Sequence, residues 1–491
     1  MITPREIGVK MIQKTNFYIN GEWVAPIEEN KFSVINPANE TAFATISLGS
    51  VSDLNKAVFA AKTAFPNWSR TPLAERIEMV KNLLSIYESR ANEMAEAISS
   101  EMGAPIKLAI NAQTAAGAGH IKAFIKALES FEFEHTLRRD TPDEYIIREP
   151  IGVCGLITPW NWPMNQVTLK VVPAVAVGCT VILKPSEIAP ISSMLFAEFM
   201  NDAGFPDGVF NLINGDGPTV GEAMSNHPEI DMMSFTGSTR AGIAVTKGAA
   251  ETVKRVSLEL GGKGANIIFS DCDVEKAVKR GAAHCFNNTG QSCNAPTRML
   301  VQKDVYQKAI QIAQETAENT EVNEPNLSGN HIGPLVSEVQ YNKVQDLIDA
   351  GIKEGAKLIA GGLGRPDGFN RGYFVRPTVF ADVNNDMRIA REEVFGPVLS
   401  IIPFETEEEA IAISNDTSYG LTDYVQSGDS ERTQRVARQL RAGMVQVNGA
   451  PRASGSPFGG YKQSGNGREG GIEGFEEFLE TKAVSGWTTT S

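Results

Sequence analysis

The sequence predicts an α/β protein built from more than one domain, and three observations support this fold class. Its 491 residues exceed what a single hydrophobic core usually holds, so about two or three domains are expected. From about residue 150, short apolar runs rich in β-branched residues alternate with helical segments, which is typical of parallel strands joined by crossover helices. A second alternating series begins after Gly264, so we expect a second α/β domain.

The first part of the chain begins with a helix and continues into a strand series. Apolar residues at positions 73, 77, 80, 84 and 87 recur with the spacing of an amphipathic helix. Thr71 is the expected cap of this helix, with Pro72 at its first position. Parallel strands are expected at residues 153–157, 181–183, 209–213, 232–235 and 256–258.

The second series predicts strands at residues 267–269, 398–402 and 444–447, with a helix over residues 274–285. Cys293 falls within this second unit. The chain has neither an internal repeat at a fixed period nor a low-complexity tract, which excludes solenoid and propeller folds.

Composition narrows the class of function. Lys plus Arg total 45 and Asp plus Glu total 59, and the net charge of −14 opposes binding to nucleic acid or anionic lipid. No apolar run approaches the roughly 18 residues of a membrane span, and residues 1–14 lack the apolar stretch of a secretory signal. The five cysteines and five histidines show no metal-ligand spacing. We therefore expect a cytoplasmic protein with reduced thiols that binds no metal, nucleic acid or membrane.

Three segments suggest chemistry. Residues 286–293, with the sequence FNNTGQSC, indicate a loop that presents the thiol of Cys293 rather than burying it. Asn161 in TPWNWP and Glu259 in LELGGK are single polar residues in apolar or glycine-rich surroundings. Together they suggest a thiol nucleophile, an amide donor and a carboxylate base. A Cys-His protease using His284 and Cys285 is disfavoured, because no third orienting group is evident and helix packing explains both residues.

Three further segments indicate a nucleotide site. Gly215, Gly217 and Gly221 resemble an imperfect dinucleotide fingerprint. Residues 235–242, FTGSTRAG, place a tight turn between a strand and a helix, whose free N–H groups attract phosphate. Lys184 and Glu187 follow a buried strand, where they could hold ribose hydroxyls or simply form a surface ion pair.

These segments match one family closely. Over nearly its whole length the chain resembles the NAD(P)-dependent aldehyde dehydrogenase superfamily, with matching motifs in order at residues 158–163, 184–187, 235–239, 259–263, 290–293, 393–397 and 457–460. The resemblance implies a Rossmann-like NAD-binding domain (residues 1–127 and 151–262) and an α/β catalytic domain (263–445). It also implies a small β oligomerisation flap (128–150 and 472–491) and an active-site and substrate-funnel loop (446–471). Residues 145–147 and 482–484 are strand-like, and the flap implies a homodimer or homotetramer.

The resemblance implies oxidation of an aldehyde to its carboxylic acid with NAD(P) as hydride acceptor. Cys293 would add to the carbonyl, and the Asn161 amide and the Cys293 N–H would stabilise the oxyanion. Glu259 would activate the water that hydrolyses the thioester, because burial beside Leu258 and Leu260 should raise its pKa. Lys170 matches a family lysine that either supports Asn161, relays protons or has a structural role.

For the cofactor, the resemblance assigns Lys184 and Glu187 to the adenosine ribose, Ser238 to the pyrophosphate, and Glu393 and Phe395 to the nicotinamide riboside. The remaining cofactor candidates lie at strand ends or glycine turns: Ile157, Thr158, Pro159, Trp160, Ser186, Gly217, Gly221, Phe235, Thr236, Gly237, Leu260 and Gly261. Glu187 favours NAD because its carboxylate would repel the 2′-phosphate of NADP, although a swing of this side chain leaves NADP open.

The sequence specifies the substrate less well than the catalytic residues or the cofactor. The expected funnel residues are Trp162, Leu169, Ser292, Asn294, Arg452 and Phe458. Trp162 and Phe458 suggest an apolar wall, and Arg452 either pairs with a carboxylate of the substrate or is a solvated loop arginine. Two alternatives stay open: a CoA-acylating semialdehyde dehydrogenase, which Glu259 argues against, and a non-catalytic binding protein with the same fold.

Overall fold

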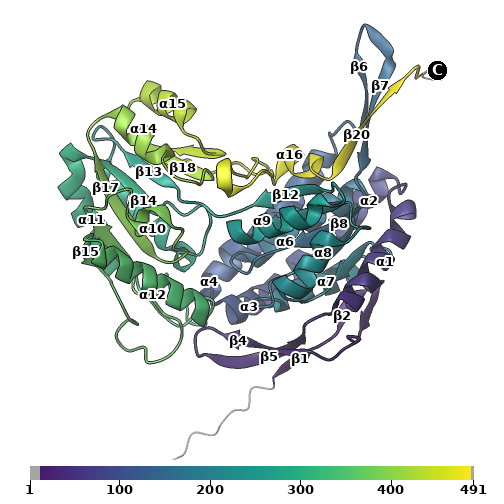
Figure 1. The fold of residues 1–491 in the computed structure, drawn as a ribbon, viewed down its shortest axis with the longest axis horizontal. Coiled ribbons are helices and arrows are strands. Elements are labelled where there is room, and N and C mark those ends of the chain that lie inside the picture. The colour runs from purple at the N-terminus through teal and green to yellow at the C-terminus, as the bar shows by residue number, and fades with distance from the viewer. Residues whose placement is uncertain (1–10, 488–491) are drawn as a thin grey trace, which may run out of the picture.

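Two seven-stranded sheets form the centre of this structure, a computed structural model that describes residues 11–487 (Figure 1). The first sheet has the order β12 (Arg255–Glu259), β11 (Met232–Thr236), β8 (Val153–Ile157), β9 (Thr180–Lys184), β10 (Phe210–Leu212), β2 (Phe17–Ile19) and β3 (Glu22–Val24). The strands from β12 to β10 are parallel, and β2 and β3 add an antiparallel edge. Each strand predicted for this unit is confirmed.

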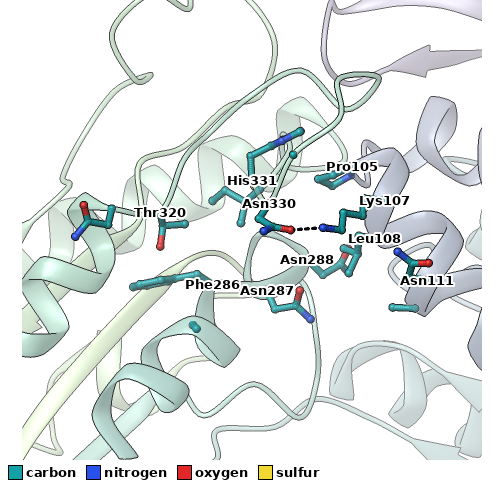
Figure 2. A pocket seen from close by; sticks show the side chains of 15 residues that line it. Pro105, Lys107, Leu108, Asn111, Phe286, Asn287, Asn288, Thr320, Asn330 and His331 are labelled. Atoms are coloured by element: carbon teal, nitrogen blue, oxygen red, sulfur yellow. Dashed lines mark hydrogen bonds between the residues drawn. The ribbon is translucent and has the colours of Figure 1, made fainter. Parts of the chain in front are cut away.

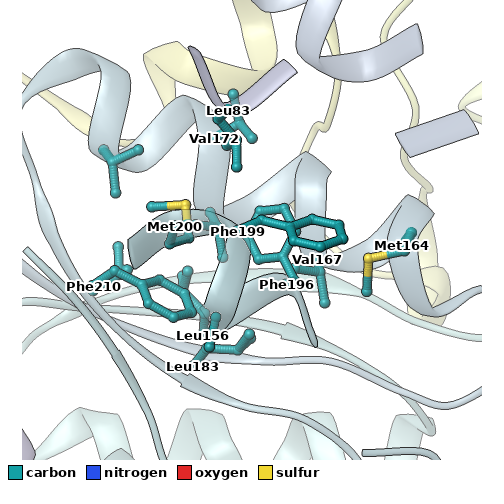
Figure 3. Packing of buried hydrophobic residues seen from close by; sticks show 14 of the residues in the cluster. Leu83, Leu156, Met164, Val167, Val172, Leu183, Phe196, Phe199, Met200 and Phe210 are labelled. Carbon is teal, nitrogen blue, oxygen red and sulfur yellow. The ribbon is translucent and has the colours of Figure 1, made fainter. Parts of the chain in front are cut away.

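The helices that accompany this sheet include one buried on all sides. They are α1 (Val51–Trp68), α2 (Leu73–Ser89), α3 (Ala91–Met102), α4 (Ile106–Leu108), the π-helix η1 (Ala109–Thr114), α5 (Ala115–Leu128), α6 (Pro163–Val177), α7 (Ile191–Asp202), η2 (Gly217–Gly221), α8 (Glu222–Asn226) and α9 (Thr239–Ala250). Helix α6 packs between neighbours, and Met164 and Val167 meet Phe196 and Phe199 of α7 above Leu156 and Leu183 of the sheet (Figure 3). The same helix begins at the site, so this core holds the site in place.

The predicted start of α2 is wrong by one residue. Pro72 has an extended ψ of 139°, so it occupies the cap position and the helix begins at Leu73. Thr71 does not cap α2, because its hydroxyl donates to the Asn67 carbonyl in the preceding turn at 3.2 Å.

The second sheet has the order β15 (Lys357–Ala360), β16 (Thr378–Ala381), β17 (Val398–Phe404), β14 (Arg298–Gln302), β13 (Ala265–Ile268), β18 (Thr422–Gln426) and β19 (Met444–Val447). Its strands are parallel except for β15. Its helical segments are α10 (Val274–Phe286), η3 (Asn287–Gly290), η4 (Lys303–Val305), α11 (Tyr306–Glu318), α12 (Glu338–Lys353), α13 (Arg388–Arg391), α14 (Glu407–Asn415) and α15 (Ser430–Gln439). The predicted strands and the predicted helix over residues 274–285 are present.

Two smaller sheets complete the fold. One contains β1 (Ile12–Lys14), β5 (Thr41–Ser47) and β4 (Lys31–Asn36). The other projects from the molecule (Figure 1) and contains β20 (Leu479–Ser485), β7 (Thr141–Pro150) and β6 (Glu134–Arg138). The two strand-like runs of the sequence pair directly in it, with Lys482 opposite Ile147 and Val484 opposite Tyr145. The chain between β19 and β20 contains η5 (Lys462–Ser464) and α16 (Gly471–Glu476).

The fold is therefore the predicted α/β fold with two parallel-sheet units and a small β flap. The expected domain limits remain predictions, and the outermost parts of the predicted first domain and flap, residues 1–10 and 488–491, lie outside the described residues.

Candidate active site

The strand order places a ligand site at one point of the first sheet. Chain order runs from β8 outward to β9 and β10 on one side, and then to β11 and β12 on the other. The order reverses between β8 and β11, and open α/β sheets bind ligands beyond the carboxyl ends of the strands at such a point. Residues 158–163, 237–238 and 260–262 follow β8, β11 and β12 there.

A cavity of about 210 Å³ lies at this position. It is lined by the predicted residues Pro159, Trp160, Asn161, Thr236, Gly237, Ser238, Leu260, Gly261, Cys293, Glu393 and Phe395, together with Gln166, Gln340 and Lys343. The two large sheet units therefore meet at one site, since Cys293, Glu393 and Phe395 come from the second unit. Gln166, Gln340 and Lys343 were not predicted.

The loop that carries Cys293 is held in an unusual backbone conformation. Asn288, Thr289 and Gly290 have consecutive positive φ angles of 52°, 57° and 71°. Position 290 requires glycine, since a Cβ there would lie 2.1 Å from the Gly396 carbonyl oxygen. Such strain persists only where the surroundings over-determine it, and it clusters at functional sites.

Asn288 ties this loop to Asn161. Its Nδ2 donates to the carbonyl oxygens of Asn161 at 3.0 Å and Gln291 at 3.2 Å. Gln113 Nε2 donates to Asn288 Oδ1 at 3.0 Å and to the Asn161 carbonyl at 3.3 Å. The Asn161 amide donates to the Gln291 carbonyl at 3.1 Å, which leaves its second N–H available toward the cavity.

Acidic groups and burial dominate the electrostatics of the thiol. Burial raises the pKa of Cys293, and the charges of Glu393, Glu259 and Glu469 raise it further. The thiol is therefore protonated near neutral pH and needs a base or a nearby positive charge to become a nucleophile.

Glu259 is the least satisfied buried group of the site. It is 2% exposed, and neither carboxylate oxygen has a hydrogen-bond partner within residues 11–487. Burial raises its pKa well above the ordinary value, Glu469 adds to this, and Lys170 and Arg468 oppose it. A base of raised pKa suits proton uptake near neutral pH.

Lys170 forms a buried ion pair that the sequence did not predict. Its Nζ donates to Glu469 Oε1 at 2.6 Å and to Ser234 Oγ at 3.0 Å. Asn161 is not among its hydrogen-bond partners, so the expected direct support of Asn161 by Lys170 is absent here. Lys170 and Glu469 instead set the charge around Glu259.

The residues at the nicotinamide end of the predicted cofactor site contact one another. Glu393 Oε1 accepts from the Gly262 N–H at 2.8 Å, and a Cβ at position 261 would lie 2.4 Å from Glu393 Oε2. The ring of Phe395, whose φ is 57°, meets Trp160 edge to face at 5.4 Å. The glycine turn and this aromatic pair line the same cavity, and aromatic walls of this kind suit a planar ring.

The other predicted cofactor residues lie outside this cavity, at the ends of β8 to β11. Lys184 is buried, and its Nζ donates to the Gly215 carbonyl at 2.6 Å and lies 3.7 Å from Glu187 Oε2. This hydrogen bond joins the end of β9 to the segment just before the π-helix η2, which runs from Gly217 to Gly221. Ser186 Oγ accepts from the Ile188 N–H, and Ile157, Thr158 and Phe235 are buried. Ser238, which does line the cavity, caps α9.

None of the predicted funnel residues is among the residues that line the 210 Å³ cavity, and two of them, Ser292 and Asn294, flank Cys293 in the sequence. Trp162 Nε1 donates to Ser292 Oγ at 2.8 Å, and the Asn294 carbonyl accepts from Tyr424 at 2.6 Å. Arg452 lies over the Phe458 ring at 4.9 Å. Leu169 is buried and faces the glycine-rich loop near Gly470.

A larger cavity of about 420 Å³ lies elsewhere, between α4 and the loops around residues 287 and 331 (Figure 2). None of the predicted site residues lines it. Two of its lining residues are hydrogen-bonded, with Lys107 Nζ donating to Asn330 Oδ1 at 2.7 Å. Asn288 lines it, so it lies behind the loop of Cys293 rather than in front of the thiol.

Within residues 11–487, no cluster of three or more His, Cys, Asp or Glu residues has metal-binding geometry. No helix of that part of the chain is long and apolar enough to cross a membrane.

A thiol beside a nucleotide-type cavity, with an amide and a carboxylate base, defines a class of oxidoreductases that act on carbonyl compounds. The sequence matches the pattern of the aldehyde dehydrogenase family over residues 23–484, and the chain belongs to this family. It is accordingly an NAD(P)-dependent dehydrogenase that oxidises aldehydes.

Comparisons with individual proteins agree. The chain is 54% identical to 3-succinoylsemialdehyde-pyridine dehydrogenase of a Pseudomonas species, covering 96% of this chain and 98% of that protein. It superposes on aldehyde dehydrogenase of Bartonella henselae with a TM-score of 0.96 and 58% identity, covering 97% and 100% of the two chains. A variant of aldehyde dehydrogenase C from Pseudomonas syringae, solved with NAD⁺ and octanal, gives 0.95 and 48%, covering 97% and 98%.

Proposed function

We propose that the chain oxidises an aldehyde to the free carboxylic acid by hydrolysis of a thioester on Cys293. The observation that carries this proposal is that Cys293 and Asn161 line one cavity at the switch point of the sheet, and that Glu259, whose carboxylate has no hydrogen-bond partner within residues 11–487, directly precedes Leu260 in the lining. Each group has the character that one step of the reaction needs.

The first step is addition of the Cys293 sulfur to the carbonyl carbon. A C–S bond forms, the carbonyl π pair moves to oxygen, and the thiol proton passes to a base. The free N–H of Asn161 and the backbone N–H of Cys293 are the donors for the oxyanion. Because Asn288 and Gln113 fix the Asn161 carbonyl, this amide needs little reorganisation during the reaction.

NAD(P), when bound, accepts the hydride that leaves the tetrahedral carbon. The residues that would hold it are Trp160, Ser238, Gly261, Glu393 and Phe395 around the cavity, with Lys184 and Glu187 toward the ribose of the adenosine. The close approach of Gly261 to Glu393 and the aromatic pair of Trp160 and Phe395 suit a ribose and a planar ring. Glu187 supports a preference for NAD over NADP.

Glu259 then removes a proton from the water that attacks the thioester carbon, and the C–S bond breaks to release the acid and the Cys293 thiol. Its raised pKa and its lack of partners support this role over a structural one. Lys170 acts on this step through Glu469 and the charge around Glu259.

The assembly and location are proposals of the same kind. The projecting sheet exposes Leu137 and Trp487 beside the edge strands β6 and β20, which supports pairing with another subunit in a homodimer or homotetramer. A cytoplasmic location stays a prediction from the sequence.

The proposed substrate is an aldehyde with a carbon chain, because one relative is solved with octanal and another is named for a succinoyl semialdehyde of pyridine.

Single-turnover kinetics tests the proposal. Glu259→Gln should release about one equivalent of reduced cofactor per active site in a burst and then turn over slowly, because acylation survives and hydrolysis does not. Hydroxylamine, which needs no general base, should restore turnover. Cys293→Ala should show no burst, whereas Cys272→Ala, which removes another half-buried thiol, should behave as the wild type.

Two results would overturn it. A full steady-state rate for Glu259→Gln would remove Glu259 as the hydrolytic base. Acceleration of the wild type by coenzyme A, with an acyl-CoA product, would favour the CoA-acylating alternative.

A further inference from the structure

The chain contains four Asn-Gly pairs, a dipeptide that is prone to spontaneous deamidation, at residues 20–21, 214–215, 448–449 and 466–467. In this reaction the backbone nitrogen of the glycine attacks the Cγ carbon of the asparagine. Glycine allows the close approach because it has no Cβ. The attack also needs a free side-chain amide and a backbone nitrogen that can lose its proton. The surroundings of each pair therefore decide whether it reacts.

Three of the four pairs are held by their surroundings. Asn214 is fully buried. Asn448 donates from Nδ2 to the Ser427 carbonyl at 2.9 Å and accepts on Oδ1 from the Ser427 N–H at 3.0 Å. Asn466 Oδ1 accepts from the Leu258 N–H at 2.9 Å. Each of these side chains must leave its place by a local opening of the structure before it can react.

The fourth pair, Asn20 and Gly21, is free of these restraints. Asn20 is exposed, and its side-chain amide has no hydrogen-bond partner among residues 11–487. The N–H of Gly21 has no backbone acceptor in the same part of the chain. Because Ile19 pairs with Glu22, these two residues form the whole loop between β2 and β3. Both reacting groups therefore lie at an exposed loop tip, the kind of place where a chain is most mobile.

The turn itself requires this dipeptide. Asn20 and Gly21 have φ angles of 54° and 79°, and two consecutive positive values are the mark of the type I′ turn, in which Asn-Gly is preferred. A Cβ at position 21 would lie 2.0 Å from Asp207 Oδ1, so a larger residue does not fit. The backbone N–H of Asn20 donates to Oδ1 of the buried Asn211 at 3.0 Å. The fold thus keeps a reactive pair at this position.

We propose that Asn20 is a site of spontaneous deamidation and that its isoaspartate product loosens the β2–β3 edge of the first sheet. The Gly21 N–H loses its proton to hydroxide, the nitrogen forms a bond to Cγ of Asn20, and the Cγ–Nδ2 bond breaks to release ammonia. Water then opens the cyclic imide at either carbonyl and gives aspartate or isoaspartate. Isoaspartate carries the main chain through its Cβ, so it adds one atom to the turn.

This added atom disturbs the contacts that define the turn. It changes the register of Ile19 with Glu22, the contact of Gly21 with Asp207 and the hydrogen bond from position 20 to Asn211. β9 and β10 separate β2 from β8, where the candidate active site begins. Deamidation should therefore lower the stability of the protein and leave kcat per folded molecule unchanged.

Ageing of the full-length protein in mildly alkaline buffer tests the proposal. A synthetic peptide of residues 17–24 is incubated in parallel, and samples are compared when half of the peptide is converted. Peptide mapping by mass spectrometry, with methylation by a protein isoaspartyl methyltransferase, locates the product. Asn20 should react at least about tenfold faster than the other three pairs, which must first open locally. The aged protein should have a lower midpoint of thermal unfolding, and acidic buffer should slow both changes.

Two variants separate this modification from other effects of ageing. Asn20→Gly keeps the turn, because Gly-Gly also adopts the type I′ conformation, so it should fold, form no isoaspartate in this turn and keep its thermal midpoint. Asn20→Asp adds the negative charge without the extra main-chain atom. When freshly prepared, it should unfold closer to fresh wild type than to aged wild type.

The proposal is overturned if Asn20 of the folded protein is unmodified when the peptide is half converted, or if another Asn-Gly pair reacts first. A loss of stability on ageing that Asn20→Gly shares with the wild type would refute its assignment to this turn.

Discussion

The Lys170–Glu469 pair offers the sharpest test of how this site is charged. The two side chains are 1% and 6% exposed, and they meet at 2.6 Å. Removing one partner of a buried ion pair leaves an unpaired charge and destabilises a protein by about 3–5 kcal/mol. Lys170→Met should therefore lower the free energy of unfolding by roughly this amount. The double variant Lys170→Met/Glu469→Gln removes both charges and should recover most of the loss.

The same variants should move the pH dependence of hydrolysis. Among the nearby charges, Glu469 raises the pKa of Glu259 more than Lys170 lowers it. Lys170→Met removes the lowering charge, so the pKa of Glu259 rises and the ascending limb of kcat against pH moves to higher pH. The double variant removes both charges, and the limb should move below its wild-type position. The midpoints should therefore rank with Lys170→Met highest and the double variant lowest.

Urea unfolding and pH–rate profiles of the four proteins, wild type, single, double and control, measure both effects. Glu473→Gln, which changes an exposed carboxylate on α16 just after Glu469, is the control and should change neither. A double variant as unstable as Lys170→Met would show that lost packing rather than an unpaired charge causes the destabilisation. An acid limb that stays in place in Lys170→Met would refute the electrostatic role of Lys170.

Three other predictions concern separate parts of the molecule. Asn161→Ala should lower the rate of cofactor reduction in a single turnover about 100- to 1000-fold without changing the fold, whereas a smaller loss than about tenfold would remove this amide from the oxyanion site. Glu187→Gln should raise kcat/KM for NADP relative to NAD by at least about tenfold, because it removes the charge that opposes a 2′-phosphate; an unchanged ratio would contradict that role. Burial raises the pKa of Glu101 to about 7 from 4.5, so its folded form holds the proton and the free energy of unfolding should fall by about 3 kcal/mol between pH 4.5 and 7. Urea titrations at several pH values should show Glu101→Gln losing this slope, and an identical slope in the variant would refute the assignment.

The sequence predicted the five parallel strands of the first sheet, because β8, β9 and β11 are short, fully buried apolar runs, the pattern of parallel strands covered on both faces; the antiparallel edge strands β2 and β3 were not predicted. The second sheet was harder to predict. β14 was not recognised, since it begins with Arg298, whose guanidinium is buried and donates to the carbonyls of Lys263, Ile413 and Ser414. An arginine argues against a buried strand until those distant acceptors are known.

The residues of the site also divide into those that the sequence predicted and those that it did not. Asn161, Glu259 and Cys293 were predictable because each is a polar residue in a short apolar or glycine-rich segment at the end of an element. Glu469 carries the same signal, a carboxylate beside Gly470 and Gly471 in a glycine-rich loop, and it was overlooked. Gln340 and Lys343 carry no such signal, since they lie on an amphipathic helix among other polar residues, and only the packing of α12 directs them to the cavity.

Several residues beside this cavity depart from the rule that buried polar groups are hydrogen-bonded. Both oxygens of Glu259, the hydroxyl of Thr236 and the Nζ of Lys263 are buried without hydrogen-bond partners among residues 11–487. All three residues belong to the FTGS and ELGGK turns beside the cavity. Leaving such groups unpaired destabilises a fold, so sequences usually avoid it away from functional sites. Burial lowers the pKa of Lys263 to about 7, so this amine can be neutral in its apolar setting, whereas the carboxyl of Glu259 avoids its burial penalty only by holding a proton. A carboxyl that is most stable when protonated takes up a proton readily, which is the property that hydrolysis of the thioester requires of it.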